Sequence, residues 1–178
     1  MSFSVPAFTS LLEYWKSCAT GSGIPSSSTF DLICIPTLLP DATLWEIDRN
    51  ERIFCRMTGT NVVERMGTDI TGRYLGDIMP AGYEEELTRH FQTIRAHPCG
   101  LYLVALNRHP NSKLVRVETL VVPLAASKGH AHKFVSLNHM MQVLGFDGDR
   151  TDTKTELGRS LEHVEYIDLG WGLPEKPF

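Results

Sequence analysis

Cysteine is scarce in this sequence, and no two cysteines lie close together. The 178 residues include four, namely Cys18, Cys34, Cys55 and Cys99, and none forms a CxxC pair. A disulfide framework or a zinc knuckle would need paired cysteines at short spacing. We therefore interpret the four residues as reduced thiols in a cytoplasmic protein.

Targeting segments and long apolar runs are absent as well. The N-terminus has no basic region ahead of its first apolar residues, and Glu13 and Lys16 interrupt the run that follows. This pattern argues against a signal peptide. No apolar run approaches the roughly 20 residues that a membrane-spanning helix needs. We expect a cytoplasmic protein without a membrane partner.

The charge pattern gives no indication of nucleic-acid binding. The net charge is -4, and the 17 basic residues form no stripe, whereas nucleic-acid-binding domains concentrate basic residues on one surface. Apolar residues make up 42% and charged residues 21% of the chain, as in an ordinary soluble domain. The length suffices for one domain with a proper core.

Known catalytic motifs are also missing. The sequence contains no nucleophile elbow, P-loop, GxGxxG or HExxH segment. No convincing acid–base pair stands out either. We therefore expect a protein that is not an enzyme.

The first structured segment that the sequence does contain is an amphipathic helix over about Ala7–Cys18. Its apolar residues fall at i, i+3, i+4 and i+7, which places them on one face: Phe8, Leu11, Leu12 and Trp15. Such a stripe is too apolar to face water. We expect these four residues to form the interface of a homodimer, although the helix could instead cover the protein's own sheet.

The remaining predicted elements follow one another in a definite order. Two strands come first, then a short helix that ends at Gly67, a long helix that Pro98 stops, and three strands joined by turn-like connectors. The strands are expected at Leu44–Asp48, Arg52–Thr58, Leu101–Arg108, Leu114–Leu124 and His132–Val143, and the long helix at Gly82–Ala96. The last three strands are apolar on both faces, so the sheet must be covered on both sides. Its second face needs the N-terminal helix, the C-terminal tail or a partner molecule.

This order predicts an α+β protein. We expect a five-stranded antiparallel sheet with helices on one face and an extra N-terminal helix outside the sheet-and-helix core. The division that follows is a helix and connector over residues 1–40, the domain itself over 41–145, and a charged tail over 146–178. Within the tail, Asp147–Arg159 is charged and poor in apolar residues, which is typical of a mobile surface segment.

The order and several motifs resemble a family of short, stand-alone PAS-type proteins found mainly in alphaproteobacteria. The matching runs are EYWKS, GIPSSSTFDLICIPTLLPDATLWEID, FCRMTGTNVVERMGTDITGR and YIDLGWG. The resemblance covers about Leu11 to Val143, with YIDLGWG as a possible addition. It implies the PAS fold and a sensory or signalling role, but no particular ligand. The light-sensing flavin subclass has a run like NCRFLQ around its reactive cysteine, whereas Cys55 lies in FCRMTG.

A modest ligand cavity is expected between the sheet and the long helix. Two methionines, a thiol and a histidine are the plausible inward polar or polarisable groups, and no phosphate-binding loop lies near them. The predicted ligand-binding residues are Cys55, Met57, Met66, Leu87 and His90. We expect a small, largely apolar ligand rather than a nucleotide, because such a pocket gains its affinity from apolar burial.

Histidines offer two alternative kinds of site. His90 lies on the apolar stripe of the long helix, where haem-binding PAS domains carry their proximal ligand, so the resemblance leaves haem open. We favour a core histidine bonded to the backbone or to Glu86, because one histidine at helical spacing is weak evidence. His130, His132 and His139 could share a strand face and chelate a metal, but no acidic or cysteine ligand joins them, and we predict no metal.

The leading functional hypothesis is a single-domain sensory module that binds a small molecule, a signalling protein partner, or both. The predicted fold occupies nearly the whole chain, so we expect the signal to pass to another protein in trans. One alternative is a ligand-independent interaction adaptor whose sheet face docks on a partner. Another is a small α+β enzyme with His90 as its base.

Overall fold

The computed structural model describes residues 3, 5–21, 23–80, 82–109, 113–126, 131–146 and 156–175. Three α-helices, three short 3₁₀ helices and six strands follow one another along these residues. They are α1 (Pro6–Ser17), η1 (Leu32–Cys34), η2 (Leu39–Asp41), β1 (Ala42–Ile47), β2 (Ile53–Thr58), α2 (Thr60–Met66), η3 (Leu75–Asp77), α3 (Tyr83–Ala96), β3 (Gly100–His109), β4 (Lys113–Ala125), β5 (Ala131–Phe146) and β6 (Glu156–Ile167). The predicted order of helices and strands is confirmed.

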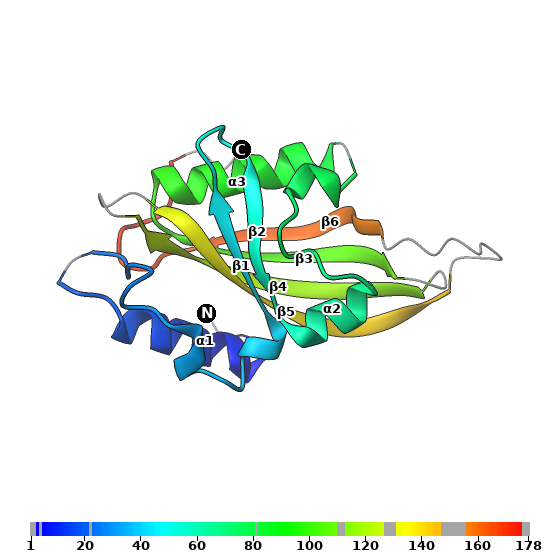
Figure 1. Ribbon diagram of the computed structural model, residues 1–178, viewed down its shortest axis with the longest axis horizontal. Helices are drawn as coiled ribbons and strands as arrows, with labels where there is room; N and C mark the ends of the chain where they lie inside the picture. The colour runs from blue at the N-terminus through cyan, green and yellow to red at the C-terminus, as the bar shows by residue number, and fades with distance from the viewer. Residues whose placement is uncertain are drawn as a thin grey trace.

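The strands form one antiparallel sheet in the order β2-β1-β5-β4-β3-β6 (Figure 1). We predicted five strands, and the structure adds β6 at the β3 edge, where Leu101 lies opposite Tyr166. Residues 156–159 of β6 belong to the stretch that we expected to be a mobile surface segment. They pair with β3 through the backbone, which does not require an apolar sequence.

The central strands pair as the sequence predicted. Leu101–His109 runs antiparallel to Lys113–Val121, with Val104 opposite Glu118. The strand β1 joins the sheet from much earlier in the chain by pairing with β5, which places Trp45 opposite Phe134. The two longest strands, β4 and β5, therefore lie in the middle of the sheet.

Helices cover both faces of the sheet. Figure 1 shows α3 above the sheet and α1 below it. Successive residues of β4 alternate between these two faces, and Leu120, Val121 and Val122 are all buried. This arrangement explains why the central strands are apolar on both sides.

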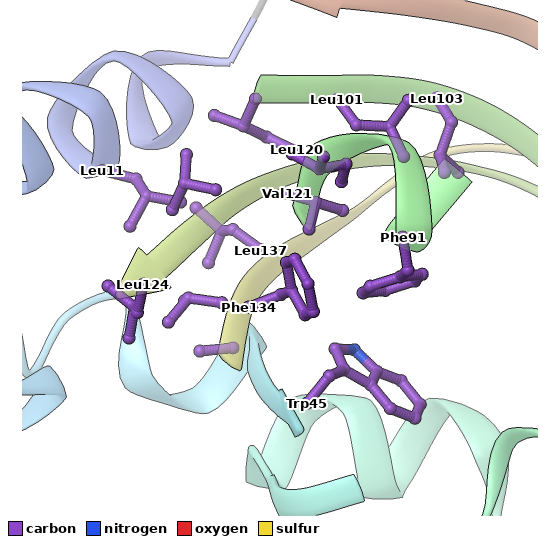
Figure 2. Packing of buried hydrophobic residues seen from close by; sticks show 14 of the residues in the cluster. Leu11, Trp45, Phe91, Leu101, Leu103, Leu120, Val121, Leu124, Phe134 and Leu137 are labelled. Carbon is purple, nitrogen blue, oxygen red and sulfur yellow. The ribbon is translucent and has the colours of Figure 1, made fainter. Parts of the chain in front are cut away.

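The apolar stripe of α1 faces the protein's own sheet. Phe8, Leu11 and Trp15 are at most 1% exposed within the single chain, and Leu12 is half-buried. The indole Nε1 of Trp15 donates a hydrogen bond of 2.7 Å to the carbonyl oxygen of Pro123 in β4, and Figure 2 shows Leu11 directed at the sheet. The stripe therefore needs no second copy to cover it, and the homodimer that we derived from it stays a prediction.

Glycines shape the segment that leads into α2 and α3. A Cβ at Gly59 would overlap the carbonyl oxygens of Leu39 and Pro40, so this close approach requires glycine. The helix α2 then ends at Gly67, whose φ of 68° is a left-handed conformation that costs glycine little. Glu84–Glu86 lie in the first turn of α3, where the helix dipole favours negative charge.

Candidate ligand-binding cavity

A cavity of about 110 Å³ lies between the sheet and the helices α2, η3 and α3. For comparison, roughly 10–15 Å³ on this kind of measure holds one water molecule, and an apolar cavity of about 150 Å³ holds benzene. Sites for drug-sized ligands are larger, at about 300–1,000 Å³. In this conformation the cavity fits a molecule of a few non-hydrogen atoms and is too small for a flavin or a haem.

Alternate residues of three strands form the floor of the cavity. Because side chains along a strand point to opposite faces in turn, each strand contributes residues two apart. The floor residues are Leu103, Ala105 and Asn107 of β3, Val117, Thr119 and Val121 of β4, and Ser136 and Asn138 of β5. The floor is apolar in its middle and polar where Thr119 lies opposite Asn138.

The helices and β1 supply the roof and one side. Tyr83, Leu87 and Phe91 follow one another at i+4 spacing on α3 and all line the cavity, as residues on one helical face do. Met66 at the end of α2 also lines it. The ring of Trp45 in β1 packs edge-on against Phe91, with 6.2 Å between the ring centres, so aromatic rings close this side.

The polar side chains at one end of the cavity already bond to one another. The Asn138 amide donates to the Asp41 carbonyl oxygen at 3.2 Å and to the Thr43 hydroxyl at 3.3 Å. Its own oxygen accepts a hydrogen bond from Thr119 at 3.1 Å. Because both N–H groups of the Asn138 amide donate and its oxygen accepts one hydrogen bond, this end does not call for a ligand to satisfy the amide.

Arg65 is the single charged side chain among the described lining residues. Its guanidinium donates to the Asp41 carboxylate at 2.6 Å and to the Asn138 carbonyl oxygen at 3.2 Å. Removing one partner of such a pair would leave the other charge partly desolvated. The ion pair therefore joins α2 to η2 and neutralises the charge of Arg65 at the cavity, while the bond to Asn138 joins α2 to β5.

Two of the five predicted ligand-binding residues, Met66 and Leu87, line the cavity. Met57 is half-buried and packs against the core, but it does not line the cavity. Cys55 is fully buried, and its backbone bonds to Gly72 and Arg73. Burial raises the pKa of the Cys55 thiol above its ordinary value, so this thiol is protonated near neutral pH.

His90 lies on the side of α3 that faces β6. Its Nδ1 is 2.7 Å from the Tyr166 hydroxyl, and the side chain is 4% exposed. We expected a bond to Glu86 or the backbone, whereas the partner comes from the strand that we did not predict. Burial lowers the pKa of His90 below its ordinary value, although Glu86 acts in the opposite direction. The imidazole is therefore neutral at neutral pH.

The polar floor residues Thr119 and Asn138 are site residues that the sequence analysis missed. Each is a polar residue inside an otherwise apolar strand, and that signal was available. Their meeting depends on the β4–β5 register, which the sequence pattern alone does not determine. The same holds for Asn107, which joins the floor because it lies two residues beyond Ala105.

The described residues contain no group of three or more histidine, cysteine or acidic side chains that could hold a metal ion. Of the three histidines considered above, His139 is exposed, while His130 and the side chain of His132 lie outside the described residues.

None of the helices in the described part of the chain is long and apolar enough to span a bilayer.

The chain is similar to known proteins in sequence and in structure. A family model of the PAS domain matches residues 3–138. A search of the curated proteins finds no match. One similar solved structure, from a study of a flavin analogue and the mechanism of a light-oxygen-voltage domain, has a TM-score of 0.48 and 8% identity, and the match covers 62% of this chain and 84% of that one. Another, a fungal light-oxygen-voltage photoreceptor domain, has a TM-score of 0.43 and 17% identity, with 65% and 95% covered. Because the family model spans well over half of its residues, this chain belongs to the PAS domain family.

Proposed function

We propose that this PAS domain is a cytoplasmic sensory module that binds a small, largely apolar molecule in the cavity between the sheet and α3. The cavity itself is the observation that carries the proposal. Its walls are mainly apolar side chains with a few polar groups among them, as in many small-molecule sites. Apolar burial then supplies most of the affinity.

The contacts of α3 suggest how a bound ligand could be reported at the surface. One side of α3 lines the cavity, while its other side bonds to the C-terminal part of the chain. His90 bonds to Tyr166, and His97 lies 3.1 Å from the carbonyl oxygen of Gly172. We propose that a ligand-induced shift of α3 moves this C-terminal segment.

The C-terminal segment also contacts the helix on the opposite face. The ring of Trp171 packs edge-on against Trp15 of α1, with 6.1 Å between ring centres. A shift of the segment would therefore reach both faces of the sheet. A signalling protein partner that docks on α1 or on this segment would sense the state of the cavity.

Native mass spectrometry and an absorption spectrum of freshly purified protein test the proposal. We expect an added mass of a small molecule, together with the oligomeric state. The substitution Ala105→Leu fills the floor of the cavity, so it should remove the added mass while the melting temperature stays level or rises. The matched change Ala42→Leu, at a buried residue that does not line the cavity, should overpack the core at a cost of about 1–3 kcal/mol.

A solid core would give a different result. The wild-type protein would then carry no added mass, and Ala105→Leu would lower the melting temperature as much as Ala42→Leu does. That outcome would contradict the sensor and leave the ligand-independent adaptor as the better hypothesis.

A further inference from the structure

Cys18 and Cys34 come together in the folded chain, although a long connector separates them in the sequence. They meet at Tyr14, because both thiols lie beside its hydroxyl group. Cys18 is the C-terminal cap of α1, and its N–H donates to the Tyr14 carbonyl oxygen at 3.1 Å. The side chains of these two residues therefore lie on one side of the helix, as residues four apart do.

Hydrogen bonds hold the connector at the same point. The Tyr14 hydroxyl donates to the Asp31 carbonyl oxygen at 2.9 Å and accepts from the Asp31 N–H at 3.2 Å. The N–H of Cys34 donates to that same carbonyl oxygen at 3.1 Å. One atom of the connector therefore bonds to both the Tyr14 side chain and the Cys34 backbone, which keeps Cys34 beside the end of α1.

The two sulfur atoms have room to meet. Cys34 is exposed and Cys18 is half-buried, and both are free thiols. The 3₁₀ helix η1, which ends at Cys34, contains no buried residue, and helix ends such as the one at Cys18 fray readily. A small shift of either segment therefore brings the sulfurs to the S–S distance of about 2.05 Å without disturbing the core.

The other two cysteines are in surroundings of a different kind. Cys55 and Cys99 are fully buried, and the Cys55 sulfur lies 3.3 Å from the Thr58 hydroxyl. Burial raises the pKa of the Cys99 thiol to about 12 and also raises that of Cys55. Because the thiolate is the reactive form, these two residues are poor targets for oxidants.

We propose that Cys18 and Cys34 form a reversible intramolecular disulfide when the protein meets hydrogen peroxide. The exposed Cys34 sulfur attacks the peroxide, its O–O bond breaks, and Cys34 sulfenic acid and one water form. The Cys18 sulfur then attacks the sulfenic sulfur, and the S–S bond forms. The hydroxyl leaves with the Cys18 thiol proton as a second water. The two thiols lose two electrons and the peroxide gains them, and a dithiol reductant reverses the bond by exchange.

The disulfide would act on α1 independently of the cavity, because neither cysteine lines that cavity. It would join the end of α1 covalently to the connector, next to Trp15. The ring of Trp15 packs against Trp171 of the C-terminal segment. Oxidation would therefore stiffen the place where α1 and that segment meet. Disulfides of cytosolic proteins are usually transient and redox-sensing, which fits a bond at the surface.

Peroxide treatment of the full chain tests the assignment. Native protein is treated with hydrogen peroxide, its remaining thiols are blocked with N-ethylmaleimide, and the denatured sample is digested for mass spectrometry. Trypsin alone leaves both cysteines in one peptide, because no Lys or Arg lies between Lys16 and Arg49. Chymotrypsin is therefore added, since it cuts after Phe30 and separates them.

Two matched variants, Cys18→Ser and Cys34→Ser, each remove one partner, and Cys55 and Cys99 serve as internal controls in every sample. We expect the wild type to lose the Cys18 and Cys34 thiols in equal amounts and to yield a linked peptide pair that dithiothreitol separates. Cys55 and Cys99 should remain blocked by N-ethylmaleimide. Dilution of the protein should leave the yield unchanged, because the reaction is intramolecular.

The variants should stop at the first step. In Cys18→Ser, the Cys34 sulfenic acid should persist long enough for dimedone to trap it, and Cys34→Ser should keep its Cys18 thiol. Three results would overturn the proposal: sulfinic acid at Cys34 with Cys18 still free, a covalent dimer through Cys34, or equal oxidation of all four cysteines in the native protein.

Discussion

Leu11 offers a direct test of the packing of α1, because its neighbour Leu12 provides a matched control. Leu11 is 1% exposed and Leu12 is half-buried, so Leu→Ala at the two positions removes the same atoms from different surroundings. A buried leucine typically loses about 2–5 kcal/mol when truncated to alanine, whereas we expect about 1 kcal/mol for Leu12→Ala. Both changes alter helix propensity equally, and the difference therefore reports packing alone.

For a chain of this length, 1 kcal/mol shifts the melting temperature by about 2–4 °C. Leu11→Ala should therefore melt about 4–20 °C below the wild type, and Leu12→Ala only a few degrees below. Urea unfolding followed by tryptophan fluorescence gives the free energies, and light scattering on the same samples gives the mass. If the two variants lost the same small free energy while Leu11→Ala alone halved the mass, the stripe would face a second copy, and our account of α1 would be refuted.

Three further predictions use paired substitutions. Val121→Ile adds a methylene on the cavity side and should keep or raise the melting temperature. Val122→Ile on the α1 side should lower it, because Val122 is fully buried and does not line the cavity. The pKa of His90 in the folded protein lies below its ordinary value, so the unfolded chain binds a proton first as the pH falls. The free energy of unfolding of the wild type should therefore drop between about pH 7.5 and about pH 5.5 more steeply than that of His90→Gln. Urea midpoints that run parallel for the two proteins over this range would contradict the prediction. Gly59→Ala should cost more than about 2 kcal/mol in a urea titration because its Cβ overlaps backbone, whereas Gly76→Ala, whose Cβ meets only ordinary contacts, should cost about 1 kcal/mol or less.

The central strands could be predicted from the sequence because they are apolar on both faces. That pattern identified β3, β4 and β5 to within a few residues. β6 gave no such signal, since residues such as Glu162 and His163 are polar and the strand is held at the sheet edge by its backbone. Its neighbours across the sheet include Arg116 of β4, whose guanidinium bonds to Glu162, a contact that depends on three-dimensional neighbours.

The cavity was predicted in place but only partly in its residues. Leu87 and Met66 follow from helical spacing, which is a local property. Cys55 follows from strand alternation, and it is buried as expected, but β2 is the sheet's edge strand and the loop at residues 72–73 covers it. His90 lies on α3 as predicted but does not line this cavity, because it bonds to Tyr166 of β6, the strand that the sequence did not reveal.

The pairing of β1 with β5 has a consequence for how the protein folds during synthesis. Thr43 and Ser136 lie 93 residues apart in sequence, and Trp15 and Pro123 lie 108 residues apart. The helix α1 and the strand β1 are therefore synthesised well before the central strands on which they pack. At about 5–20 residues per second, translation of that interval takes about 5–20 s. Throughout it, the stripe of α1 and Trp45 have no sheet to cover them. We expect the nascent chain to depend on chaperones in this window, and the meander of β3, β4 and β5, whose contacts are local, to form before either joins it.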